Sequence, residues 1–166
     1  MNRKQEFLKE LNKEAITTRK MLSVVPDDKY DWKPHPKSMN IRQLTGHIAE
    51  LPSWIKMVLI TTELDFAGSP YVSPAINDTK ALLALFEKSL AETQEAIPQA
   101  KEESLDDLWT LRNGENIYNR EPKSDVIRMS LSQIIHHRAQ LGVFLRLLDV
   151  PIPGSYGPSA DEDNFN

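Results

Sequence analysis

The chain of 166 residues is long enough for one domain with a substantial core, and 40% hydrophobic and 27% charged residues are ordinary for a soluble globular protein. The formal net charge of −4 and the lack of a basic block argue against a nucleic-acid partner, and the absence of cysteine excludes disulfides, thiolate metal sites and a cysteine nucleophile. No apolar run approaches the length of a membrane span, and the polar N-terminus lacks the apolar core of a signal peptide, so we expect a cytoplasmic protein without membrane contact.

The first part of the chain predicts two helices joined by a proline-containing loop. Over residues 3–25 and 40–63, apolar residues recur at steps of three and four, which is the spacing of one helix face. Asn40 or Ser38 is placed to cap the second helix. His47 lies beside the apolar stripe of this helix, so its imidazole should point inward, and Glu50 follows on the same side.

A third helix is predicted over residues 78–96, where the same spacing recurs and Pro98 should end the helix. Residues 104–122 have a different pattern, with short apolar stretches on either side of the turn pair Asn113-Gly114. We therefore expect a short hairpin or extended excursion between the third and fourth helices of an otherwise all-α bundle.

The fourth helix should begin at Ser124, which is a good capping residue, and end at Asp149. It is apolar on two faces, and a lone bundle covers only one of them well. A partner subunit would cover the second face, where the small side chains of Ala139 and Gly142 permit close approach. We therefore expect a homodimer formed through this helix.

The same helix carries a polar stretch, Ser132–Gln140, inside its apolar run, and buried polar groups need partners. Gln133 and His137 are four residues apart and so lie about 40° apart around the helix axis. Together with His47 of the second helix they predict a polar site between the two helices. Without a metal, the two histidines would be a hydrogen-bonded pair in the core.

Residues 151–162 are rich in proline and glycine, and we expect them to fold back over the bundle as a C-terminal tail. Residues 1–166 would then form a single domain. Arg138 lies within the polar stretch and is expected to form a salt bridge within the bundle rather than to bind an anionic substrate.

Four segments of the chain are distinctive in combination: DWKPHPKSM (31–39), HIAE (47–50), HHRAQ (136–140) and PIPGSYGPSADE (151–162). Together they resemble the DinB-like superfamily, which includes the bacillithiol transferase-like proteins. The resemblance implies a four-helix bundle, usually a homodimer, with a divalent metal such as nickel or zinc held by three histidines. His47 and His137 match two of these histidines, whereas Gln133 stands where the family has the third. His136 is the next candidate ligand if Gln133 does not take part.

The resemblance further implies a metal-dependent enzyme that activates a thiol or water for transfer, isomerisation or hydrolysis of a small molecule. Because the chain has no cysteine, the thiol would have to be a low-molecular-weight cosubstrate. Glu50 is the candidate catalytic proton acceptor, or a partner that orients His47. Gln133 also favours an alternative, because an amide binds Zn or Ni less well than imidazole does. That alternative is a metal-free dimeric bundle that binds a small molecule or serves in a stress response without catalysis.

Overall fold

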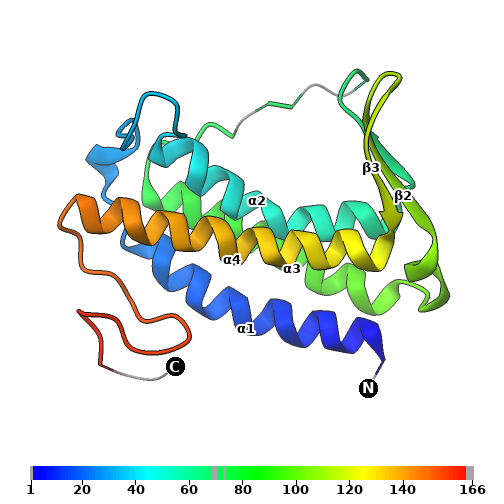
Figure 1. The fold of residues 1–166 in the computed structure, drawn as a ribbon. Coiled ribbons are helices and arrows are strands. Elements are labelled where there is room, and N and C mark those ends of the chain that lie inside the picture. The colour runs from blue at the N-terminus through cyan, green and yellow to red at the C-terminus, as the bar shows by residue number, and fades with distance from the viewer. Residues whose placement is uncertain (1, 69–70, 73, 164–166) are drawn as a thin grey trace.

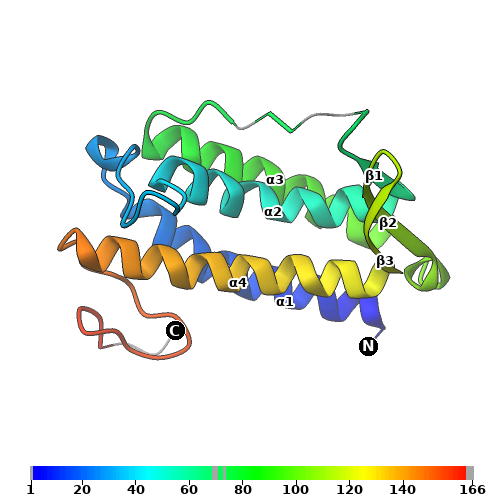
Figure 2. The ribbon, with the colours of Figure 1, turned by 45° about the horizontal axis from the view of Figure 1, so that its top comes forward.

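Four long helices make up most of the structure, a computed structural model that describes residues 2–68, 71–72 and 74–163. The helices lie side by side in a bundle (Figure 1 and Figure 2). None of the helices in the described ranges is long and apolar enough to cross a membrane. In chain order they are α1 (Arg3–Ser23), α2 (Ile41–Ile60), α3 (Thr79–Gln99) and α4 (Lys123–Leu147), with two short 3-10 helices, η1 (Asp27–Lys29) and η2 (Glu103–Asp106), in the connections.

The apolar stripes of the helices meet in one core. The α1 and α2 helices each pack against both α3 and α4, so every helix buries one face against two neighbours. Burial of these side chains supplies most of the folding free energy, at roughly 25 cal/mol per Å² of apolar surface. The most deeply buried members include Leu11, Leu22, Leu44, Ile48, Ile55, Leu82, Phe86, Leu131 and Leu141.

Two of the helices begin with the same reciprocal cap. The side chain of Asn40 accepts a hydrogen bond from the backbone N–H of Gln43, and the Gln43 side chain accepts one from the backbone N–H of Asn40. Asn2 and Gln5 repeat this arrangement at the start of α1. Each pair satisfies two backbone groups that a helix end leaves without partners. The expected start of the second helix at Asn40 is confirmed.

A small three-stranded sheet is present at one end of the bundle, so the structure is not purely all-α, whereas we expected an all-α bundle with only a short hairpin or extended excursion. Its strands are β1 (Glu63–Asp65), β2 (Leu108–Asn113) and β3 (Asn116–Pro122). The expected hairpin is present as β2 and β3, which pair antiparallel around Gly114, whose φ of 59° suits glycine. The β1 strand pairs with β2 in parallel. At three residues it is too short to show an alternating pattern in the sequence.

Trp109 fixes the sheet to the bundle. Its side chain is buried, and its indole N–H donates a hydrogen bond to Thr61 Oγ1 at 2.9 Å. Thr61 is the C-cap residue of α2, so the hairpin is held against the C-terminal end of that helix. A ribbon view shows the strands beside the end of α2 and the start of α4 (Figure 2).

Several predicted helix boundaries were wrong, and the first and fourth helices end two residues earlier than expected, at Ser23 and Leu147. The second helix ends at Ile60 because residues 63–65 join the sheet. The third continues through Pro98 and ends where Ala100 adopts an extended conformation. The fourth begins at Lys123 with Pro122 at the cap position, and Ser124 lies inside its first turn, without a side-chain cap hydrogen bond.

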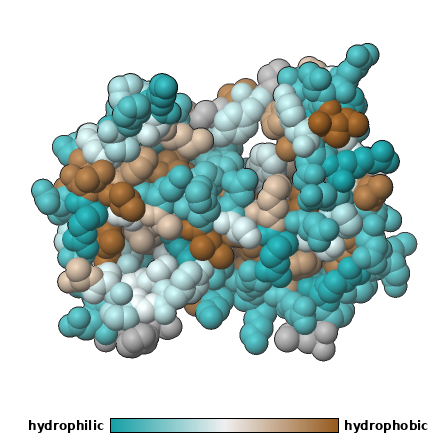
Figure 3. All heavy atoms as spheres, viewed as in Figure 1, coloured by the Kyte–Doolittle hydropathy of each residue, from teal (hydrophilic) through white to brown (hydrophobic). Residues whose placement is uncertain are grey.

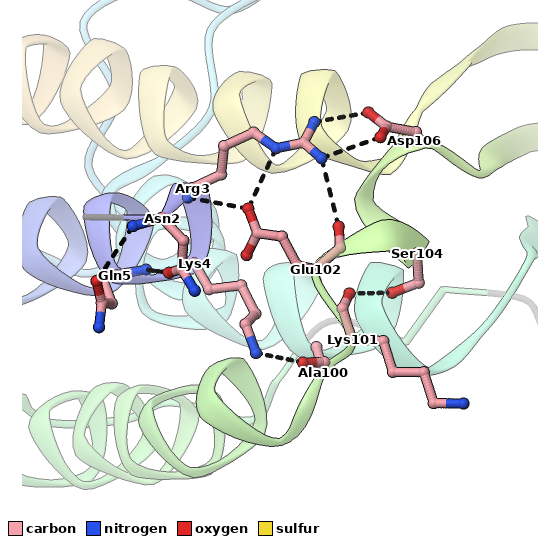
Figure 4. Close-up of polar contacts among 9 residues, drawn as sticks. All are labelled: Asn2, Arg3, Lys4, Gln5, Ala100, Lys101, Glu102, Ser104 and Asp106. Carbon is pink, nitrogen blue, oxygen red and sulfur yellow. Dashed lines mark hydrogen bonds and ion pairs between the residues drawn. The ribbon is translucent and has the colours of Figure 1, made fainter.

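Figure 4 shows how the start of α1 is tied to the segment that follows α3. The Arg3 guanidinium pairs with Asp106, with Nη1 and Oδ1 2.6 Å apart, and with Glu102, with Nε and Oε1 3.4 Å apart. Lys4 donates to the carbonyl of Ala100. Because these groups are partly exposed, each pair contributes little, and their role is to fix the position of η2 before the hairpin.

The C-terminal tail folds back on the bundle and covers a buried ion pair between α1 and α4. Arg138 Nη1 lies 2.7 Å from Glu14 Oε2, and it also donates to Thr18 Oγ1 at 3.1 Å. Tyr156 of the tail donates its hydroxyl to Glu14 Oε2 at 2.8 Å and accepts from Arg138 Nη2 at 3.0 Å. Arg138 thus forms the expected salt bridge within the bundle.

Candidate functional site

His47 of α2 and His137 of α4 lie against each other between the two helices. Their ring centroids are 4.8 Å apart and their planes meet at 75°, an edge-to-face contact. Both side chains are half-buried. Each histidine comes from the edge of an apolar stripe, and the packing of α2 on α4 turns the two edges toward one another.

Two glutamines hold the ring of His137 from both sides. Gln133 Oε1 lies 2.8 Å from Nε2, and Gln140 Oε1 lies 2.9 Å from Nδ1. A neutral imidazole carries only one N–H, so it can donate to only one of two amide oxygens. Gln140 can accept the Nδ1 proton, and Nε2 then faces the oxygen of Gln133 with a lone pair, unless the Gln133 amide is turned around. A cation shared by Nε2 and Oε1 would satisfy both atoms.

Burial of the His47 ring lowers its pKa below the ordinary value, and the neighbouring His137 lowers it further. A hydrogen bond with Gln133 acts in the opposite direction but does not outweigh them. The imidazole of His47 is therefore neutral at neutral pH. A neutral imidazole is the form that binds metals.

His136 stands at the rim of this group. Its side chain is exposed, and its ring packs edge-on against His137 with centroids 4.9 Å apart. The atom that lies next to His137 Nε2 is Oε1 of Gln133, which is one helical turn earlier. The geometry thus favours Gln133 over His136 as the third member of the group.

Glu50 does not join the histidines. It accepts a hydrogen bond at 2.7 Å from the hydroxyl of Tyr71, and burial raises its pKa, an effect that the Tyr71 hydrogen bond only partly offsets. Its carboxylate lines a cavity of about 200 Å³, and the other lining residues lie farther along α2, in β1 and in the segment after β1. One helical turn thus separates two polar features, the histidine pair and the Glu50 cavity.

Few side chains of the kinds that hold a divalent metal lie together near His137. The described part of the chain contains no group of three or more His, Asp or Glu side chains placed to hold an ion. The candidate ligands are therefore two imidazoles and one amide oxygen, from His47, His137 and Gln133. In the tautomer of His137 that carries its proton on Nδ1, the 2.8 Å between Gln133 Oε1 and His137 Nε2 brings two lone pairs together, so these residues fit an ion, with one weak ligand.

Two contributors to this region were missed by the sequence interpretation. Gln140 is three residues after His137 on the same side of α4, and this spacing was a signal that could have identified it. Tyr71 lies in the loop after β1, where no periodic pattern points toward Glu50. Its contact is set by the tertiary fold alone.

The sequence profile of the DinB family matches residues 1–164. The chain belongs to the DinB family. A curated relative, the uncharacterised protein YrdA of Bacillus subtilis, is 24% identical over 160 residues, covering 94% of this chain and 89% of YrdA. The expected resemblance is thereby confirmed.

Several solved structures share this fold. The DinB-like protein YjoA of Bacillus subtilis superimposes with a TM-score of 0.70 at 16% identity, covering 96% of this chain and 99% of YjoA. YfiT of Bacillus subtilis, described as a probable metal-dependent hydrolase with an unusual four-helix bundle topology, gives 0.65 at 14% identity and 89% coverage of each chain. A mycothiol-dependent maleylpyruvate isomerase gives 0.61 at 19% identity, over 84% of this chain and 60% of that one.

Proposed function

We propose that this DinB family protein is a metal-dependent enzyme that holds a nickel or zinc ion with His47, His137 and Gln133. The observation that carries the proposal is the arrangement around His137, where two amide oxygens face the two ring nitrogens. A neutral imidazole has one N–H, so when both amides present their oxygen atoms only one of the two contacts can be an ordinary hydrogen bond. A cation on the Gln133 side resolves the conflict, and the contact with His47 supplies a second imidazole.

Each residue has a separate task in this site. His47 stays neutral because its ring is buried, so its lone pair is available without prior loss of a proton. Gln140 Oε1 accepts a hydrogen bond from the Nδ1–H of His137, which fixes the tautomer and directs Nε2 toward Gln133. When bound, a divalent ion lowers the pKa of a coordinated thiol or water and so makes it a nucleophile at neutral pH.

The reaction class is the transfer, isomerisation or hydrolysis of a small molecule. The structural neighbours described as a thiol-dependent isomerase and as a probable metal-dependent hydrolase support this range. The chain has no cysteine, so any thiol chemistry requires a low-molecular-weight thiol as cosubstrate. Glu50, whose raised pKa suits a proton acceptor, would act on a substrate that extends from the histidine pair along α2.

The test is metal analysis of protein purified without a metal-affinity tag, followed by metal titration of wild type and Gln133→His. The substitution replaces the weak ligand by a third imidazole, so Zn or Ni should bind more tightly. Each tenfold gain in affinity adds about 1.4 kcal/mol of metal-linked stability, or roughly 3–6 °C in Tm. Equal metal-induced shifts in both proteins would show that Gln133 does not take part, and His136→Ala would then be compared.

A metal-free bundle that binds a small molecule is the second candidate. It is favoured by the lack of a third ionisable ligand among the described residues. In that case Gln133 turns its amide group and donates to His137, and the histidines form a hydrogen-bonded core. Metal below one ion per ten chains in tag-free protein, together with no Tm response of Gln133→His, would favour this candidate over the enzyme.

We further propose that two copies associate through the outer face of α4. Part of this face is covered by the protein's own tail, which bounds a largely apolar cavity of about 550 Å³ over Gly142 and Ala139. Val143 and Leu147 remain 60% and 59% exposed. Figure 3 shows apolar atoms on the surface over the C-terminal part of α4. Adjacent exposed apolar side chains of this kind mark interaction surfaces.

A further inference from the structure

A small aromatic pocket lies on the Glu50 side of α2, apart from the histidine pair. Its cavity of about 200 Å³ is smaller than the roughly 300–1,000 Å³ of pockets for drug-sized ligands, so it fits a head group. Three aromatic side chains, Trp54, Phe66 and Tyr71, line it together with the Glu50 carboxylate. Met57 and Leu64 add apolar surface, and Ser53 is the one further polar residue among the described residues that line it.

The fold holds these side chains in place from two directions. Trp54 is one helical turn beyond Glu50, so both project from the same side of α2. The backbone N–H of Phe66 donates to the carbonyl of Arg112 at 3.0 Å, which extends the pairing of β1 with β2 to the edge of the pocket. Tyr71 is joined to Glu50 by its hydroxyl. The small sheet therefore positions one wall of the pocket against the helix.

Glu50 has no counter-ion among the residues that the structure describes. No Lys, Arg or His in the parts of the chain that the structure describes forms an ion pair with it, and burial raises its pKa. Two lysines of this region do not form an ion pair with it. Lys88 lines a second cavity, on the α3 side, to which Glu50 also contributes, and Lys56 pairs with Glu92 at 3.0 Å. A half-buried carboxylate without a cation costs free energy that a bound cation would recover.

We propose that the aromatic pocket formed by Glu50, Trp54, Phe66 and Tyr71 binds a small organic ammonium group, such as an alkylated amine. The faces of aromatic rings attract cations, and several rings around one carboxylate suit a diffuse, weakly hydrated charge. A metal ion would need more oxygen or nitrogen ligands than this wall offers. A neutral apolar ligand would leave the carboxylate without its counter-charge. This inference is independent of whether His47 and His137 hold a metal.

Choline and its uncharged carbon isostere, 3,3-dimethylbutan-1-ol, test the proposal by isothermal titration calorimetry on the full chain. They have nearly the same shape and differ in charge. Choline should bind at least about tenfold more tightly, since the cation–π and carboxylate contacts act only on the charged head group. Equal affinity for both ligands, or no binding of choline up to about 10 mM, would overturn the proposal.

Variants assign the binding to the pocket. Glu50→Gln and Trp54→Leu should each weaken choline binding about tenfold. Glu92→Gln is the matched control, because this carboxylate does not line the aromatic pocket and already has Lys56 as partner, so the choline affinity of this variant should match wild type. Circular dichroism checks that each variant is folded. If Trp54→Leu does not fold, Trp54→Phe replaces it, with a smaller but measurable loss. Unchanged choline affinity in folded Glu50→Gln would place the cation elsewhere.

Discussion

Replacing Arg138 by leucine should be among the most destabilising single changes in this chain. Arg138 and Glu14 are only 2% and 5% exposed, so removal of the guanidinium leaves a buried carboxylate with the Tyr156 hydroxyl as its remaining side-chain partner. Breaking a buried pair in this way typically costs about 3–5 kcal/mol. For a chain of this length that is roughly 6–20 °C in Tm. The double variant Glu14→Leu/Arg138→Leu removes both charges and should recover most of the loss.

The assay is urea unfolding followed by circular dichroism, with the free energy of unfolding taken by linear extrapolation. Arg19→Leu serves as the control, because Arg19 pairs with Glu87 on the surface with 42% and 47% of the two side chains exposed. An exposed pair contributes about 0–1 kcal/mol. A loss in Arg138→Leu no larger than that in Arg19→Leu would refute the reasoning, as would a double variant less stable than Arg138→Leu.

Two further predictions concern the surface of α4 and the Glu50 cavity. The double variant Val143→Glu/Leu147→Glu should be a monomer by light scattering where the wild type is a dimer, and a monomeric wild type at high concentration would contradict the dimer. Gly142→Glu is a poorer probe, because a Cβ at this position faces Met21 of the same chain at 3.6 Å. Burial raises the pKa of Glu50 above its ordinary 4.5, so ionisation of this carboxyl destabilises the folded state. The loss of stability is absent below pH 4.5 and complete once the pH exceeds the raised pKa. Ligand-free Glu50→Gln should therefore be more stable than wild type at about pH 7, with a difference that disappears toward acid pH in urea titrations; a constant difference would argue against it.

The sequence predicted the helices well because their packing leaves a regular trace in it. The apolar steps of three and four along α2 and α4 are the same contacts that build the core. The hairpin was predicted from Asn113-Gly114, since a tight turn requires these residues locally. The β1 strand was missed because its pairing with β2 is formed by segments far apart in the chain. Pro98 was misjudged because a proline near the end of a helix costs less than one at its centre.

The position of the histidine pair could be predicted from the sequence because it too follows from the periodic pattern of the helices. His47 and His137 lie at the edges of periodic stripes, so their approach follows from the packing of two helices. The partners of Glu50 and Arg138 did not follow from any pattern. Tyr71 reaches Glu50 from an irregular loop, and Tyr156 reaches Arg138 from the tail, and neither segment has a repeat that fixes where its side chains go.

The tail contact imposes an order on the formation of the native state. Glu14 is made early in synthesis, but Tyr156, which caps its ion pair with Arg138, lies 142 residues later. Closing such a long stretch of chain is costly before other contacts have formed, so this cluster is completed after the helices have packed. Until Tyr156 has been made, the pair of Arg138 and Glu14 lacks its cover, so α1 and α4 are closed over at this point only after the tail has docked.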